Sequence, residues 1–91
     1  MKALNKEAID KELLKATDWY FKDNAIEKKF VFKDFNQALG FIVRVGLLCE
    51  KKNHHPEIFN VYNKITLRLS THDAKGITEI DFALAKAINE L

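Results

Sequence analysis

The sequence predicts an α+β fold, a two-layer sandwich in which helices cover one face of a four-stranded antiparallel sheet, in the order α-β-β-α-β-β-α. Three stretches carry apolar residues at helical spacing, one near each end of the chain and one in the middle. Between them lie two pairs of short strand-like segments, each pair separated by a turn too short for a crossover connection. Strands joined in this way pair antiparallel, and the helices then collect on the apolar face of the sheet.

The first part of the chain is expected to form a helix and a hairpin. Asn5 is of a residue type that caps helices, and the first helix is predicted to run from there to about Thr17. Residues 19–21 are too aromatic for a loop and are predicted as a short strand. The chain then turns at residues 23–24 and continues in a second strand, residues 26–33, where aromatic residues alternate with lysine and valine.

The central helix has the clearest start signal in the chain. Asp34 is followed three residues later by Gln37, a capping-box pattern just before an apolar period. The helix is predicted to run to about Lys52. The stripe expected to face the core consists of Phe35, Leu39, Ile42, Gly46 and Cys49.

The second half is predicted to form another hairpin and a final helix. A strand at residues 59–62 leads into residues 65–70, where apolar and polar residues alternate as in a strand with one buried and one wet face. Residues 74–76 form a turn, and Thr78 with Asp81 resembles a second capping pair. The stripe expected to face the core from the final helix consists of Ile80, Leu84, Ala87, Ile88 and Leu91.

Length and composition bound the class of protein. The chain has 91 residues, of which 47% are hydrophobic and 31% charged, and is expected to form a single globular domain over residues 1–91. A chain this short buries a modest fraction of its surface, so burial between subunits is a natural source of stability and we expect a homo-oligomer. The net charge of +2 is too small to predict direct binding of nucleic acid.

Cysteine usage and the absence of export signals predict a soluble cytoplasmic protein with no membrane partner. Cys49 is the only cysteine, so no intramolecular disulfide forms. The N-terminus becomes charged within a few residues, unlike a signal peptide, and no apolar run approaches the roughly 20 residues of a membrane span. Cys49 falls on an apolar helix face, where an inert thiol is far more frequent than a nucleophile.

The three histidines are the main functional clue. His54 and His55 precede Pro56, which biases His55 toward extended backbone, and His72 follows the alternating strand. On extended backbone the neighbouring imidazoles of His54 and His55 must point in different directions. If the pleat of the alternating strand persists, His72 projects from the polar face of that strand. Histidine has an ordinary pKa of about 6.5, so both protonation states are available near neutral pH for general acid–base catalysis.

Two alternatives compete with this catalytic interpretation. Any one of these histidines taken alone is more often a surface or capping residue than a functional one. A zinc site is the second alternative, since imidazole and carboxylate are common ligands and Glu50, Glu57 and Asp73 lie nearby in the sequence. Neighbouring histidines on extended backbone diverge instead of converging on one ion, so acid–base chemistry is favoured and no metal is expected.

A series of fixed spacings gives the sequence a family resemblance. The series is Glu50, His54-His55-Pro56, Tyr62, His72 and Asp81, with Asn53, Glu57, Val61, Asn63, Lys64, Ser70, Thr71 and Asp73 around it. In these positions the chain resembles the pterin-4a-carbinolamine dehydratases, over about residues 19–88. Several fixed spacings together are far more specific than one short motif.

The resemblance implies a reaction that needs no cofactor. Its substrate is the 4a-hydroxytetrahydropterin, such as 4a-hydroxytetrahydrobiopterin, left by an aromatic amino acid hydroxylase. The product is the quinonoid dihydropterin, which a reductase recycles. By the same resemblance His54, His55 and His72 are the catalytic set: His54 and His72 transfer protons, and His55 mainly holds the ring.

The resemblance also implies the substrate-binding residues and the assembly. The binding residues are Glu50, Asn53, Ile58, Ser70, Thr71 and Asp73. Family members form dimers or tetramers, so a homodimer or homotetramer is expected. Some members carry tryptophan where Ile58 stands and arginine where Ile80 stands. A lost stacking contact is worth about 0.5 to 1.5 kcal/mol, so we expect changed substrate affinity or pterin side-chain preference before changed chemistry.

Two other functions fit the same resemblance. Some family members bind a homeodomain transcription factor and stabilise its dimer, a role that depends on exposed apolar surface on helices. The fold is also suited to binding a related pterin, such as a molybdopterin precursor, without dehydrating it. Dehydratase, interaction protein and pterin-binding protein therefore stand as alternatives.

Overall fold

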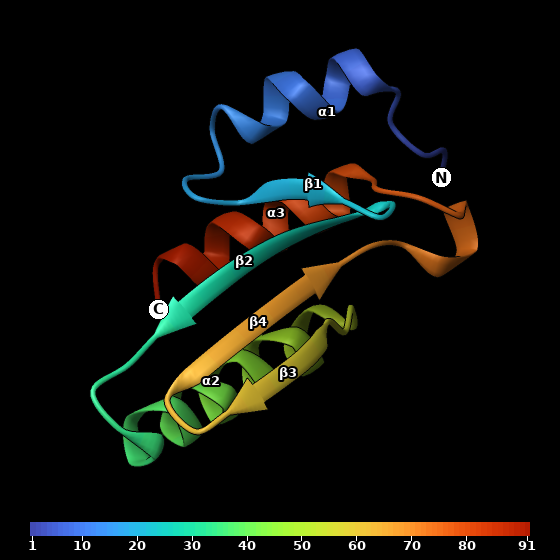
Figure 1. Cartoon of the computed structure of the whole chain (residues 1–91). Coiled ribbons are helices and arrows are strands. Elements are labelled where there is room, and N and C mark those ends of the chain that lie inside the picture. The colour runs from blue at the N-terminus through green and yellow to red at the C-terminus, as the bar shows by residue number, and fades with distance from the viewer.

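The four strands form one antiparallel sheet with the spatial order β1-β2-β4-β3 in a computed structural model that describes residues 1–91 (Figure 1). The elements are α1 (Lys6–Leu13), β1 (Tyr20–Lys22), β2 (Ala25–Val31), α2 (Phe35–Lys52), β3 (Glu57–Val61), β4 (Lys64–Leu69), a short 3₁₀ helix η1 (His72–Ala74) and α3 (Glu79–Asn89). In Figure 1, α2 and α3 lie behind the sheet and α1 lies beyond β1. The predicted α+β class and the predicted order of helices and strands are confirmed.

The first helix and hairpin match the prediction in type but not at every boundary. The side chain of Asn5 caps α1 by accepting from a backbone N–H of the first turn at 2.9 Å. The helix ends at Leu13 instead of about Thr17, because the next N–H groups bond to carbonyls three residues back, in tighter turns. Asp23 and Asn24 have φ values of 49° and 59°, as a two-residue hairpin turn of type I′ requires.

The central helix packs on a different face from the one predicted. Asp34 caps α2 as expected, accepting from the N–H of Gln37 at 2.9 Å. The residues of α2 that are buried are Ala38, Phe41, Val45 and Cys49. Only Cys49 of the predicted stripe is among them, and Phe35 and Leu39 remain 44% and 45% exposed. The predicted stripe was wrong because α2 is apolar on two sides, and only its docking on the sheet selects the buried one.

The final helix has the predicted capping box but a different buried face. Thr78 caps α3, and the side chain of Asp81 accepts from the backbone N–H of Thr78 at 2.9 Å. Leu84 and Ile88 are buried as predicted, but Ile80 is 38% exposed. Asp81 takes the buried position next to Ile80, because its carboxylate is fully hydrogen-bonded there. No helix of the protein combines the length and the apolar composition that crossing a lipid bilayer requires.

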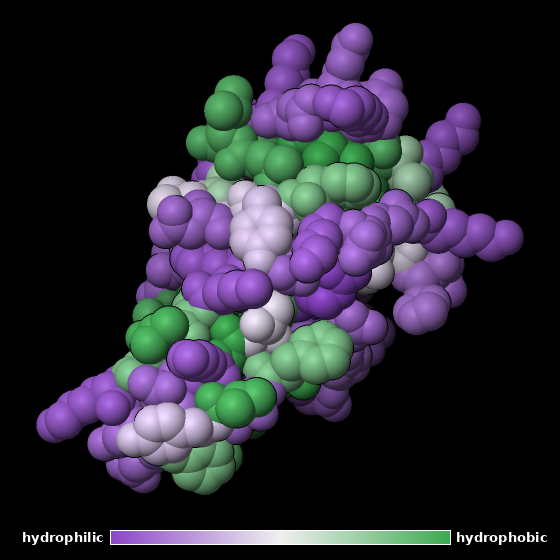
Figure 2. Space-filling model, in the orientation of Figure 1, coloured by the Kyte–Doolittle hydropathy of each residue, from purple (hydrophilic) through white to green (hydrophobic).

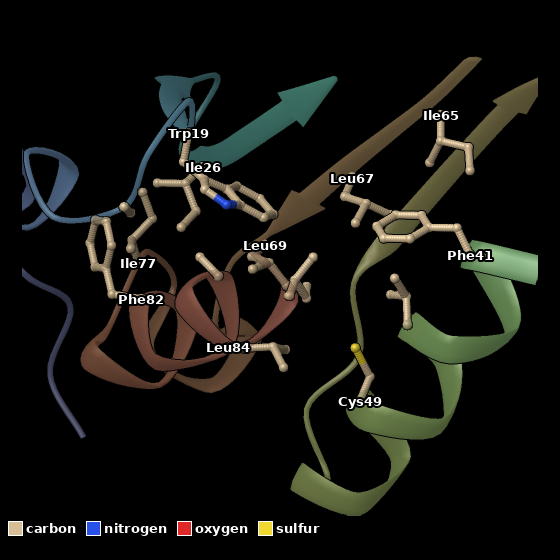
Figure 3. Packing of buried hydrophobic residues seen from close by; sticks show 14 of the residues in the cluster. Trp19, Ile26, Phe41, Cys49, Ile65, Leu67, Leu69, Ile77, Phe82 and Leu84 are labelled. Carbon is tan, nitrogen blue, oxygen red and sulfur yellow. The ribbon is translucent and has the colours of Figure 1, made fainter. Parts of the chain in front are cut away.

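The core lies between the sheet and the helices. Ile65, Leu67 and Leu69 of β4 are buried, which confirms the predicted alternation of that strand. Sixteen buried residues form one hydrophobic cluster. In Figure 3, Phe41 and Cys49 of α2 point toward the sheet, and the side chains of α3 meet those of β2 and β4.

A row of polar side chains crosses the opposite face of the sheet. Strand pairing aligns Tyr20, Glu27, Arg68 and Glu57, one from each strand. Arg68 lies 2.9 Å from Glu27 and 3.1 Å from Glu57, and the Tyr20 hydroxyl donates to Glu27. Figure 2 views this face: hydrophilic side chains cross the middle of the sheet, and hydrophobic ones gather toward the end where β3 and β4 join.

Candidate functional site

The candidate site lies at the open end of the β3–β4 hairpin. Glu57 pairs with Arg68 at this end of the two strands. Extending the same register outward places His55 beside Ser70 and His54 beside Thr71. The hairpin therefore brings together two segments that lie about 16 positions apart in the sequence.

A polar cavity of about 250 Å³ occupies this position. The residues that line it are Asn53, His54, His55, Ser70, Thr71, His72 and Asp73. All three histidines and four of the six expected binding residues therefore surround one space. Glu50 does not line the cavity, but it contacts His55. Ile58 also lies outside it: its strand partner is Leu67, so it sits on the helix-bearing face of the sheet.

The end of α2 positions His54 and His55. Asn53 adopts a left-handed conformation with φ of 53°, and the N–H of His54 donates to the carbonyl of Cys49 at 3.1 Å. This is the pattern of a Schellman helix end, which stops the helix and redirects the chain. Pro56 then keeps the backbone extended into β3.

The two neighbouring imidazoles diverge, as expected. Nε2 of His54 lies 2.5 Å from Oδ1 of Asp81, and the His54 side chain is only 14% exposed. Nε2 of His55 lies 2.7 Å from Oε1 of Glu50, and both of these side chains are largely exposed. No three or more histidine, cysteine, aspartate or glutamate side chains are arranged so that they could hold a metal ion. His54 and His55 therefore each have a separate carboxylate partner.

His72 reaches the cavity on a short loop instead of on a continued strand. It begins η1, so the pleat of β4 does not persist, and its exposed side chain takes no part in the hydrogen bonds that hold the other two histidines. Backbone hydrogen bonds between Thr71 and Gly76 close the loop. A Cβ atom at Gly76 would lie 2.9 Å from the Cβ of Ala3, so the N-terminal segment packs directly against the base of this loop. An exposed imidazole on a closed loop is accessible and yet held in place.

Asp81 contacts the site, although it is not among the catalytic and binding residues predicted from the sequence. It is fully buried and accepts hydrogen bonds from the Thr71 hydroxyl at 2.8 Å and the backbone N–H of Thr78 at 2.9 Å, in addition to its contact with His54. The sequence marked Asp81 only as a helix cap and as the last position of the spaced series. One carboxylate therefore caps α3 and holds a histidine of the cavity.

The cysteine next to the site has the properties of a packing residue. Cys49 is completely buried, and burial raises the pKa of its thiol to about 11. The thiol therefore stays protonated near neutral pH, which removes the nucleophilic form.

Comparisons with known proteins agree with these features. The family model described as pterin 4 alpha carbinolamine dehydratase matches residues 2–91. A relative from Sulfurisphaera tokodaii is 46% identical over 91 residues, covering 100% of this chain and 98% of its own length. One from Rhizobium johnstonii is 44% identical over 92 residues, covering 99% of this chain and 91% of its own. Both are provisionally named pterin-4-alpha-carbinolamine dehydratase.

A solved structure shares the whole fold. A crystal structure of a protein from Brucella melitensis, named transcriptional coactivator/pterin dehydratase, superposes with a TM-score of 0.93 at 37% identity. The match covers 98% of this chain and 97% of the other. With the spaced histidine series, the polar cavity and these matches over nearly every residue, the chain belongs to the pterin 4 alpha carbinolamine dehydratase family.

Proposed function

We propose that this protein dehydrates a 4a-hydroxytetrahydropterin to the quinonoid dihydropterin by general acid–base catalysis. The observation that carries this proposal is the gathering of His54, His55 and His72 around one small polar cavity. A volume of about 250 Å³ fits a fused two-ring heterocycle better than a large ligand. Membership of the family supports the substrate class.

The reaction needs two proton transfers. The bond between C4a and its hydroxyl oxygen breaks while the lone pair of N5 forms the C4a–N5 double bond. One proton must reach the departing oxygen, which leaves as water, and the proton of N5 must be removed. Two imidazoles, His54 and His72, supply the base and the acid, and such catalysis typically contributes about 10² to 10⁴-fold.

The other polar side chains of the cavity are proposed to hold the pterin. The edge of a pterin ring carries several donors and acceptors, and the cavity offers Asn53, Ser70, Thr71 and Asp73 to pair with them. His55 is exposed and held by Glu50, so we assign it a role in holding the ring. In this scheme the substrate comes from an aromatic amino acid hydroxylase and the product goes to a reductase.

The test is dehydration of enzymatically generated 4a-hydroxytetrahydropterin, followed by the loss of its absorbance. His54→Ala and His72→Ala should each reduce kcat at least about tenfold, and His55→Ala should mainly raise KM. Leu14→Ala, at an 87% exposed position of the turn after α1, is the control and should match the wild type. Wild-type rates in both His54→Ala and His72→Ala would rule out the mechanism.

We also propose that the protein associates with further copies of itself through α2. The exposed apolar residues of this helix are Phe35, Leu39, Val43 and Leu47, spaced four residues apart along one side. A helix that is apolar on both sides needs a partner on each, and the sheet covers only one. A two-fold axis near the middle of this stripe would bring the same stripe of a second copy against it, with the two α2 helices antiparallel.

Sedimentation of the wild type and of Leu47→Glu tests this assembly. An unpaired charge buried in this apolar contact should shift the protein to smaller species. Leu14→Glu introduces the same charge at another exposed leucine and should leave the distribution unchanged. A monomeric wild type at about 100 µM, a concentration that populates even weak dimers, would contradict the proposal.

A second candidate function is that of an interaction protein. The same exposed stripe of α2 favours it, as does the similarity to a protein named transcriptional coactivator/pterin dehydratase. The partner would be a helical dimerisation segment of a transcription factor, docked on α2 in place of another copy. Binding of such a segment should be abolished by Leu47→Glu and unaffected by His54→Ala, whereas dehydration depends on His54.

A further inference from the structure

The hydrogen bonds around Asp81 have a fixed direction. Oδ2 of Asp81 lies 2.9 Å from the backbone nitrogen of Thr78, which is always a donor, and 2.8 Å from the hydroxyl of Thr71. Two hydrogen bonds donated to one oxygen favour the ionised form of a carboxyl group, so the proton between Asp81 and His54 is carried by the imidazole. The Asp81 carboxylate is then an acceptor in each of its contacts.

The other protons follow from this direction. Thr71 donates its single hydroxyl proton to Asp81, so the Thr78 hydroxyl, 2.8 Å from that of Thr71, donates to Thr71. Nε2 of His54 donates to Oδ1 of Asp81. In its neutral form His54 is therefore the Nε2–H tautomer, with its lone pair on Nδ1.

Nδ1 of His54 opens into the cavity. It has no hydrogen-bond partner in the chain, and every side-chain nitrogen or oxygen that is shielded from solvent does have one. Nδ1 is therefore in contact with solvent. Because the side chain is only 14% exposed and lines the polar cavity, this contact is made from inside the cavity.

We propose that Asp81 is a positioning residue that fixes His54 as the Nε2–H tautomer, so that Nδ1 is the nitrogen that exchanges a proton with the substrate. This inference rests on the proposed dehydration and refines it to a single atom. Neutral His54 accepts the N5 proton at Nδ1, and the Asp81 carboxylate balances the charge of the resulting imidazolium. His72, which has no such partner, donates the proton that leaves with the hydroxyl as water. Proton exchange with solvent restores both rings.

The contrast with His55 strengthens the assignment. His55 also has a carboxylate at Nε2, but this pair is exposed on both sides, with 59% and 79% of the side chains accessible. Water competes for each of these groups, and nothing else holds Glu50 in place. Asp81, in contrast, is held by the backbone of α3 and by Thr71. Only the tautomer of His54 is therefore fixed by the fold.

The tautomer is read directly by long-range proton–nitrogen NMR of the folded protein at about pH 9, where imidazoles are ordinarily neutral. We expect the wild type to show His54 protonated at Nε2. Asp81→Asn should invert this state: the amide oxygen must replace Oδ2, because the Thr78 N–H points at it, and the amide NH₂ then donates to Nε2. The inverted ring carries its proton on Nδ1, and kcat should fall at least about tenfold.

Two variants serve as controls. Glu50→Gln makes the same carboxylate-to-amide change at His55 and should leave the His54 tautomer unchanged. Asp34→Asn makes it at the cap of α2, where no histidine is in contact, and should leave both tautomer and rate unchanged. If Asp81→Asn does not fold, His54→Gln replaces it: its amide reaches the Nε2 position and bonds to Asp81, but it has no group at Nδ1. This variant should fold and lose activity as severely as His54→Ala.

The outcomes separate this proposal from the proposed function. A wild-type His54 protonated at Nδ1, or an Asp81→Asn variant that keeps the wild-type tautomer, would overturn the positioning role whatever the activity. Full activity in His54→Gln, or in an Asp81→Asn variant whose His54 carries its proton on Nδ1, would overturn the assignment of proton transfer to Nδ1. A wild type that has the expected tautomer but dehydrates no pterin would instead overturn the proposed function.

Discussion

Nη1 of Arg68 lies 2.9 Å from Oε1 of Glu27 on the face of the sheet that α2 and α3 do not cover. Glu27 is 4% exposed, and the Tyr20 hydroxyl bonds to its other carboxylate oxygen. Arg68 also reaches Glu57 and the carbonyls of Lys22 and Asp23, so it connects the two hairpins of the sheet. The network stabilises the strands that carry the candidate site at their ends.

Glu27→Gln should lower the free energy of unfolding by about 1 to 3 kcal/mol at neutral pH, because Arg68 loses its buried partner. The hydrogen bond from Tyr20, and to a smaller extent the one from Arg68, holds the pKa of Glu27 below its ordinary value of 4.5. Its stabilising effect is therefore complete above pH 4.5 and is lost as the pH falls through the lower, folded value. Denaturant titrations between about pH 3 and 7 should show wild type and variant converging in acid.

Glu57→Gln is the matched control, since Glu57 is an exposed partner of the same arginine. An exposed pair contributes about 0 to 1 kcal/mol, so this change should have a small effect. An equal loss of unfolding free energy in Glu27→Gln and Glu57→Gln would contradict the larger contribution assigned to the buried Glu27.

Tyr20→Phe should remove a tyrosine that ionises only at unusually high pH. Its hydrogen bond to Glu27, together with burial, raises the pKa of Tyr20 from 10.0 to about 12. Because the folded value lies above the unfolded one, this stabilisation is complete below pH 10 and is lost as the pH rises toward 12. The tyrosinate absorbance of the wild type should rise in a step near pH 12 that Tyr20→Phe lacks. A wild-type titration without such a step would contradict the hydrogen bond between Tyr20 and Glu27.

Cys49 should resist thiol reagents in the folded protein. Complete burial blocks access, and the raised pKa of about 11 keeps the thiolate scarce at neutral pH. A disulfide reagent should react with Cys49 only in denaturant. Rapid reaction of the native protein at pH 7 would show that the end of α2 opens.

Asn89→Ala should lower the free energy of unfolding by about 1 to 3 kcal/mol. The Asn89 side chain accepts from Nε1 of Trp19 at 3.0 Å and from Nζ of Lys28 at 2.7 Å, so its loss leaves the buried indole N–H without a partner. Tryptophan fluorescence in a denaturant titration measures the change. Glu90→Ala, at the exposed next position, should stay within about 0.5 kcal/mol of the wild type.

The element types followed from the sequence because each segment carries one clear period. The alternation of β4 and the capping pairs at Asp34 and Thr78 depend on neighbours a few residues away, which the sequence displays directly. The buried face of α2 did not follow, because Leu39 and Phe41 are equally apolar and only the sheet distinguishes them. Local patterns thus predict elements well and helix docking poorly.

The same limit explains what the sequence revealed of the site. The gathering of His54 and His72 was expected from a series of spacings, and both line one cavity. The contact between His54 and Asp81 spans 27 positions and depends on how α3 docks beside the end of α2, which no local pattern encodes. Ile58 was expected in the site, but the strand register turns it to the other face.

The short distance between Gly76 and Ala3 has a practical consequence for work with this protein. The first few residues support the loop that presents His72, and the N–H of Leu4 donates to the carbonyl of Ile77 at 2.8 Å. A purification tag fused ahead of Met1 would begin two residues before Ala3, whereas one attached behind Leu91 would extend from the end of the chain that follows α3. Kinetic comparisons are therefore best made on protein extended at its C-terminus.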